Sequence, residues 1–151
     1  MYSCVYKIAF NKTSSELNEE YERFSDIEKE TVANLGADSY FDYEHENKYV
    51  CFLITTPLEI RKYTEILSNN FIEHKFINLS NDILKRNYDI EEDICDKVDP
   101  LDSIKWSFFT EDIDLWIIEN LDIDLVLDRI SEVGIDNLSK NESNFLKSYK
   151  P

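Results

Sequence analysis

Residues 48–59 read KYVCFLITTPLE and place a strand directly before the start of a helix. The apolar run from Tyr49 to Ile54 has the length and β-branched content of a buried strand. In the following Thr56-Pro57-Leu58-Glu59, threonine and glutamate have the spacing of a capping box. Proline occupies the first helical position, where its missing amide hydrogen costs nothing. The stretch therefore predicts a strand over residues 48–56 and a helix that ends near residues 68–70.

A strand and a helix also precede this stretch. Residues 2–10 alternate in hydrophobicity, which predicts a strand with one well-buried face. Thr13 and Glu16 form another capping box, and the apolar residues that follow recur at close to a 3.6-residue period. Gly36 suits the position just after a helix. We therefore expect one helix between residues 13 and 35.

Two more strands complete the N-terminal part. Residues 39–43 form a short strand that a polar turn joins to the strand over 48–56, and residues 71–79 alternate as a fourth strand. The order is then strand, helix, strand, strand, helix, strand. This order predicts an α+β fold in which residues 1–87 form a ferredoxin-like βαββαβ plait, an antiparallel sheet with both helices on one face.

The composition changes after residue 87. Residues 88–128 contain 14 acidic and two basic residues, a net charge of −12, whereas the whole 151-residue chain carries −16. Aromatic and aliphatic residues run through the same segment, so it is not a solvated tail. We expect residues 88–151 to form an acidic helical extension packed on the first domain.

Capping residues predict three helices in this extension. Thr110 can cap a helix that runs through Asn120, with acidic residues in its first turn where the helix dipole favours them. Asp122 or Asp124 can cap a second helix. Ser139 with Glu142, three residues later, forms a capping box that opens a short third helix.

The C-terminal stretch of residues 125–146 reads LVLDRISEVGIDNLSKNESNFL. It resembles the pattern LDKIS-x-x-G-x-x-SL-[ST]-x-x-E-x-x-FL, which closes some bacterial rhomboid-family proteins and many small uncharacterised bacterial proteins. Arg129 stands where lysine is usual, and Asn137 where serine is usual. The resemblance implies a helical hairpin in a bacterial protein, and it transfers no catalytic residue.

The composition argues against several classes of protein. Two glycines, Gly36 and Gly134, are too few for a glycine-rich phosphate loop. The net charge of −16 disfavours a basic groove for nucleic acid, although a ferredoxin-like sheet can bind RNA through its aromatic residues. There is no secretory signal and no apolar run of transmembrane length. We therefore expect a cytoplasmic protein with reduced, structural cysteines at positions 4, 51 and 95.

No motif for a metal, a cofactor or catalysis is present. His45 and His74 have no second ligand at helical spacing, and the acidic residues between Asp122 and Asp128 lack the glycine and glutamate of a calcium loop. Paired carboxylates such as Glu111 and Asp112 are inevitable among 32 acidic residues. We expect no cofactor and no enzymatic activity.

The acidic and aromatic segment over residues 88–128 is the most informative feature. It is either a solvated helix face or a surface that docks on a basic protein. We favour docking by an inhibitor or immunity-like protein, in which carboxylates steer the partner and stand in for phosphates while partly exposed tryptophans anchor the interface. The candidate partner-binding residues are Trp106, Asp112, Asp114, Trp116, Glu119, Asp122 and Asp124.

Two alternatives remain open. In the first, the chain is a regulatory ferredoxin-like module that binds a small ligand or forms a homodimer. In the second, it is an enzyme. An enzyme requires a concave pocket with a carboxylate whose pKa is raised.

Overall fold

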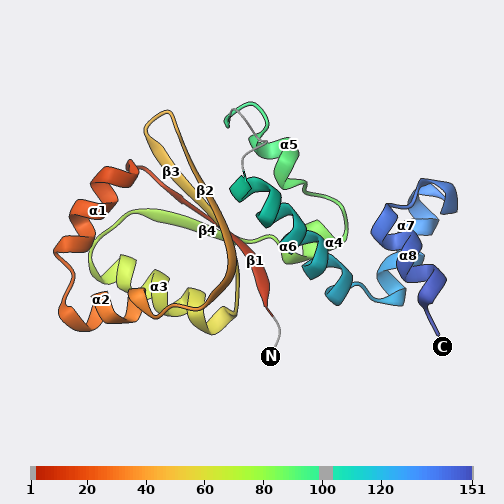
Figure 1. Ribbon diagram of the computed structural model, residues 1–151, viewed down its shortest axis with the longest axis horizontal. Coiled ribbons are helices and arrows are strands. Elements are labelled where there is room, and N and C mark those ends of the chain that lie inside the picture. The colour runs from red at the N-terminus through yellow and green to blue at the C-terminus, as the bar shows by residue number, and fades with distance from the viewer. Residues whose placement is uncertain (1–2, 99–103, 151) are drawn as a thin grey trace.

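The fold combines one antiparallel sheet with helices, so the expected α+β class is confirmed (Figure 1). The computed structural model describes residues 3–98 and 104–150, and Tyr2, within the first predicted strand, lies outside them. Among the described residues, four strands lie in the order β2-β3-β1-β4, and each neighbouring pair is antiparallel. The strands are β1 Cys4–Phe10, β2 Ala37–His45, β3 Lys48–Thr55 and β4 His74–Asn78.

Three helices cover one face of the sheet: α1 Ser14–Glu22, α2 Asp26–Ala33 and α3 Pro57–Asn69 (Figure 1). The expected single helix over residues 13–35 is wrong, because the helix is interrupted between α1 and α2. Ser25 caps α2 in its own capping box with Glu28, and Phe24 is buried at the break. This second capping box, within the apolar pattern, starts a new helix, and the first helix therefore ends early.

Helix α3 begins and ends as predicted, but two details around it differ from the sequence prediction. Thr56 caps the helix as expected, but the Glu59 carboxylate accepts a hydrogen bond from the Gly36 amide at 3.1 Å instead of completing a capping box. After α3, Phe71 has a φ of 58°. This left-handed residue turns the chain, so β4 begins at His74 and the expected strand start at residue 71 is wrong.

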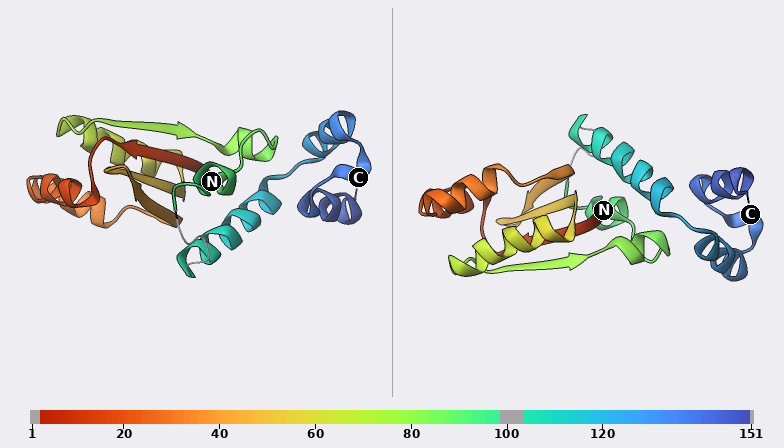
Figure 2. Two further views of the ribbon diagram at one scale, coloured as in Figure 1. Left: turned by 90° about the horizontal axis from the view of Figure 1, so that it is seen from above. Right: turned by 90° about the horizontal axis from the view of Figure 1, so that it is seen from below.

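Helix α4 Ser80–Leu84 and two helices of the acidic segment, α5 Ile90–Ile94 and α6 Ile104–Asn120, cover the opposite face of the sheet (Figures 1 and 2). Their apolar side chains join Val5 and Phe52 of the sheet in a core separate from the one beneath α1–α3. Helix α6 begins before Thr110, so the expected cap there is wrong. The Thr110 hydroxyl donates instead to the Ser107 carbonyl at 2.9 Å, within the helix.

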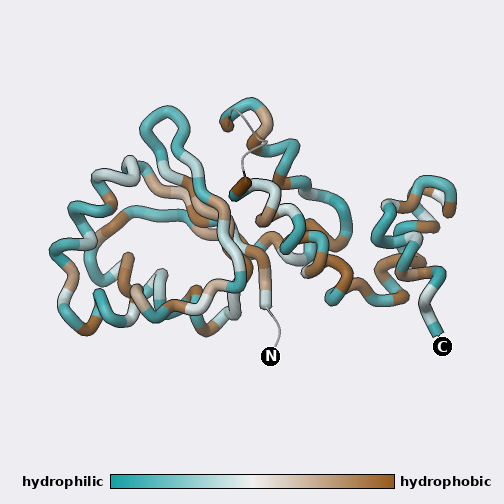
Figure 3. The backbone as a smooth tube through the Cα atoms, viewed as in Figure 1, coloured by the Kyte–Doolittle hydropathy of each residue, from teal (hydrophilic) through white to brown (hydrophobic). Residues whose placement is uncertain are grey.

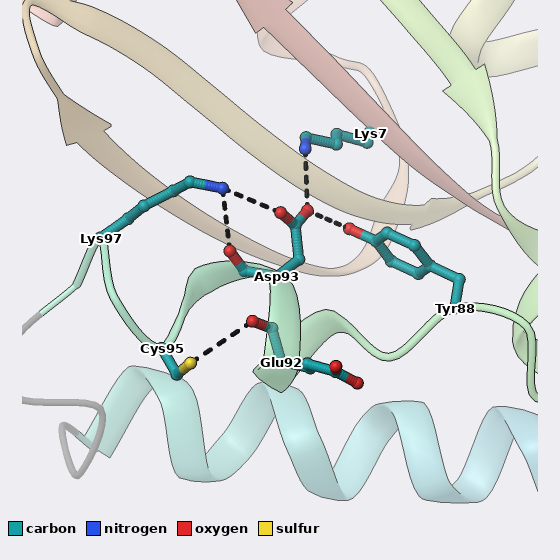
Figure 4. Close-up of polar contacts among 6 residues, drawn as sticks. All are labelled: Lys7, Tyr88, Glu92, Asp93, Cys95 and Lys97. Carbon is teal, nitrogen blue, oxygen red and sulfur yellow. Dashed lines mark hydrogen bonds and ion pairs between the residues drawn. The ribbon is translucent and has the colours of Figure 1, made fainter.

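Asp93 fastens α5 to the sheet (Figure 4). Its carboxylate accepts hydrogen bonds from Lys7 of β1 at 2.8 Å, from Lys97 at 2.9 Å and from the Tyr88 hydroxyl. Burial opposes ionisation of Asp93, but these three donors outweigh it and hold the pKa of the carboxyl well below its usual range.

The chain ends in α7 Ile123–Val133, the 3₁₀ turn η1 Ile135–Asn137 and α8 Lys140–Ser148. Asp122 caps α7 and Ser139 forms a capping box with Glu142, both as predicted. Buried Glu142 also pairs with Arg86 at 3.4 Å, which links α8 to the chain after α4. These helices lie at the end of the molecule remote from α1 (Figures 1 and 2). None of the helices in the described part of the chain is long and apolar enough to cross a bilayer.

Candidate functional site

Helix α6 is apolar on two opposite faces, and only one of them is covered. The inner face packs against the sheet through Trp106, Phe109 and Trp116, all buried. In Figure 3 the α6 backbone accordingly alternates between hydrophobic and hydrophilic residues along its length. A helix of a single-domain protein normally presents one apolar stripe to the core and a polar face to water.

The outer face of α6 carries a second apolar stripe. Ile104, Phe108, Leu115 and Ile118 have exposed fractions of 74%, 62%, 57% and 52%. Together with Glu111 they recur in alternating steps of four and three residues, the spacing that aligns side chains along one side of a helix for pairing with another helix. We call Ile104, Phe108, Glu111, Leu115 and Ile118 the outer stripe.

Carboxylates border the outer stripe on both sides. At 3.6 residues per turn, Asp112 and Glu119 lie along one side of it and Asp114 along the other. Asp114, Glu119 and the central Glu111 are exposed, and Asp112 is half-buried. Lys105 is the one basic residue of α6. The outer stripe is therefore an apolar strip in an anionic frame.

The structure distributes the predicted site residues over several positions. Asp112, Asp114 and Glu119 frame the outer stripe. Asp122 accepts a hydrogen bond from the Leu125 amide at 2.8 Å as the cap of α7, and Asp124 lies in the first turn of that helix. Asp122 thus has a structural role that is independent of any partner.

The expected partial exposure of the two tryptophans is wrong. Trp106 is 7% exposed and packs edge-to-face on Phe41, with ring centroids 4.9 Å apart. Trp116 is 4% exposed, and its indole Nε1 donates to the Ser3 carbonyl at 3.0 Å. Both rings complete the core on this face of the sheet, so neither is accessible to anchor a partner.

The sequence prediction missed Ile104, Phe108, Leu115 and Ile118 as site residues. Their spacing is visible in the sequence, but the inner face of α6 has the same period. Periodicity alone does not tell which of two apolar stripes meets the sheet.

A cleft of about 490 Å³ opens beside α6, between this helix, the segment around α4 and α5, and the start of α8. Its floor is apolar and includes Phe109, Ile113 and Ile117. The polar part of the lining includes five carboxylates, those of Asp89, Glu91, Glu92, Asp114 and Glu142, and its one cation, Arg86, is paired with Glu142. Such a cleft suits a lysine or arginine side chain and repels phosphate.

Within the described ranges, no group of three or more histidine, cysteine or acidic side chains is arranged to hold a metal ion. His45 lies at the end of β2, 3.6 Å from Glu46, and His74 begins β4, where its Nδ1 is 2.9 Å from the Ile72 carbonyl.

Comparison of the chain with protein-family models, with curated proteins and with solved structures finds no match. The C-terminal resemblance to bacterial proteins therefore stays a prediction.

Proposed function

We propose that this chain is a non-enzymatic acidic binding protein that docks on a basic protein through residues 88–128, as an inhibitor or immunity-like protein does. The observation that carries the proposal is the exposed outer stripe of α6 with carboxylates on both sides. We also assign residues 1–87 to a ferredoxin-like plait and residues 88–151 to an acidic helical extension. The strand order β2-β3-β1-β4 supports this assignment.

The apolar part of the stripe supplies affinity. Burying one exposed leucine, isoleucine or phenylalanine side chain contributes roughly 1.5–3 kcal/mol before the costs of association. The four apolar residues of the outer stripe are each at least half exposed. Full coverage by a partner therefore stabilises a complex by several kilocalories per mole.

The charges favour a cationic partner over a second copy of this chain. In an antiparallel pair of α6 helices, Glu111 at the centre of the stripe would face Glu111 of the other copy. Two chains of net charge −16 would also repel each other at long range. A helix with apolar residues at the same spacing and lysine or arginine beside them complements both the stripe and its frame.

The acidic cleft extends this surface beside α6. A basic side chain of the partner that enters it would meet Asp114 and the carboxylates around α5 over an aromatic and aliphatic floor. Nucleic-acid-binding enzymes present the same kind of cationic surface to phosphates. This chemistry favours such an enzyme as the target and disfavours direct binding of nucleic acid by this chain.

A capture experiment with matched variants tests the proposal. The tagged chain and three variants are exposed to lysate of the source cells at low and high salt, and each retained protein is identified by mass spectrometry. The first variant, Phe108→Ser/Leu115→Ser, disrupts the stripe. The second reverses Glu111, Asp112, Asp114 and Glu119 to lysine and leaves the α7 cap intact. The control reverses four exposed acidic residues elsewhere: Glu19, Glu30, Glu65 and Glu73.

We expect one basic protein to be retained by the parent chain and by the control at low salt, and more weakly at high salt. Both α6 variants should lose it while keeping the parent's circular dichroism spectrum. Equal retention by all four proteins, or capture of no basic protein, would overturn the proposal.

A further inference from the structure

A second cavity, of about 200 Å³, lies on the other face of the sheet, away from α6. Its walls come from β1, β3, α2, the chain that leads into β2, and α3. The lining is almost entirely apolar and includes Ile8, Phe10, Leu53 and Ile60. No residue of the proposed docking surface contributes to it, so its function is independent of the acidic segment.

The passage of the chain from α2 into β2 borders this space. Helix α2 ends at Ala33, and the chain then passes along the cavity through Leu35 and Gly36 into β2. Two hydrogen bonds fix this passage: Thr55 Oγ1 donates to the Gly36 carbonyl, and the Gly36 amide donates to Glu59. Side chains of β3 and α3 therefore hold the backbone of this wall in place.

Besides Thr55 and Glu59, three polar side chains belong to the lining. The Tyr49 hydroxyl donates to Asp42 at 2.5 Å, and the Cys51 thiol lies 3.7 Å from the Phe52 carbonyl. The Tyr63 hydroxyl has no hydrogen-bond partner among residues 3–98 and 104–150. Burial raises the pKa of Tyr63 and that of Cys51 to about 12 each, so both groups are neutral at physiological pH.

We propose that this cavity binds a neutral, mostly apolar molecule of about one aromatic ring that carries a single hydrogen-bonding oxygen for the Tyr63 hydroxyl. Apolar cavities of about 150 Å³ accept benzene, so the space is sufficient for such a ring. An apolar lining with one free polar group is the usual design of a small-molecule site. A charged ligand would lose its hydration: an anion would also meet the Glu59 carboxylate, and a cation would find that carboxylate already paired with Lys62.

Phenol, toluene and benzoate are matched probes because they differ in one substituent. Binding is followed by the chemical shifts of the methyl groups of Ile8, Leu53 and Ile60 as each probe is titrated into the full chain. We expect phenol and toluene to shift these signals saturably, and benzoate to leave them unchanged. Tyr63→Phe should weaken phenol about threefold to tenfold, the loss of one hydrogen bond, and leave toluene unaffected.

A cavity-filling variant completes the test. Val32→Phe places a larger side chain into the cavity from α2 and should abolish binding of both neutral probes, with Ile27→Phe on the exposed face of the same helix as control. The proposal is overturned if neither neutral probe binds. It also fails if benzoate binds as tightly as phenol, or if Tyr63→Phe weakens toluene and phenol equally. Should Val32→Phe not fold, the Tyr63→Phe comparison decides alone.

Discussion

At the residue scale, Asp93 shows how a single acidic residue is used internally in an acidic protein. It lies in the segment that carries most of the negative charge, yet its carboxylate is saturated by Lys7, Lys97 and Tyr88 (Figure 4). Cys95, two residues later, is exposed, and its thiol donates to the Glu92 carbonyl at 3.4 Å. The excess charge of the segment is therefore not all available to a partner.

The depressed pKa of Asp93 predicts a loss of stability in acid. In the unfolded chain an aspartate titrates near pH 3.9, whereas in the folded chain its pKa is lower. Between these values the unfolded state binds more protons, so the free energy of unfolding falls as the pH falls below about 5. Urea denaturation at a series of pH values from 7 to 3 measures this fall.

The variant Asp93→Asn isolates the contribution of this residue. At pH 7 it should be less stable than the parent by about 1.5–3 kcal/mol, because hydrogen bonds to a charged group are lost, and its stability should depend less on pH in acid. Asp96→Asn, an exposed neighbour, is the control and should follow the parent. Parallel pH curves for the parent and Asp93→Asn would contradict the assignment.

At the scale of the element, the two faces of α6 define a comparison within one helix. Leu115 and Trp116 are adjacent in the chain but have exposed fractions of 57% and 4%. Helical geometry places them on different sides, one toward solvent and one toward the sheet. The same helix therefore contributes both to the core and to the proposed docking surface.

Truncation of these two neighbours should have very different effects on stability. Trp116→Ala should lower the free energy of unfolding by about 3–5 kcal/mol, because it leaves a cavity in the core. Leu115→Ala should change it by no more than about 0.5 kcal/mol. Urea denaturation of both variants gives the two numbers. A large loss for Leu115→Ala would show that the outer stripe is covered within the chain itself.

At the scale of the whole molecule, the sheet is a shared layer between two cores. Tyr6 and Ile8 of β1 face the helices that precede β4, while Val5 of the same strand faces the acidic helices. Successive side chains of β1 point to opposite faces of the sheet and therefore contribute to both cores. The acidic segment is part of the fold as well as the proposed site of docking.

Removal of residues 88–151, the acidic helical extension, should therefore destabilise the rest. A chain of residues 1–87 exposes the sheet face on which Val5, Phe41 and Phe52 lie, and we expect it to aggregate or to unfold without cooperativity. Size-exclusion chromatography and thermal unfolding of this fragment check the prediction. A monomer with a sharp unfolding transition would instead establish residues 1–87 as an independent domain.

Local signals in the sequence were sufficient for the α+β class and for four of the eight α-helix starts in the described residues. Thr13, Thr56, Asp122 and Ser139 cap the helices predicted for them, because a cap depends on neighbours within three residues. The acidity of residues 88–128 is likewise a property of the sequence alone.

Tertiary structure decided which of the two apolar stripes of α6 is buried. Both stripes of α6 have helical spacing, and only packing of Trp106 and Trp116 against the sheet leaves Phe108 and Leu115 outside. The partner of Glu59 and the cavity beside Tyr63 also depend on segments distant in sequence, whereas the break at Ser25 follows from a local capping box. Periodicity specifies that a face is apolar, whereas the shape of the surrounding chain determines which surface covers it.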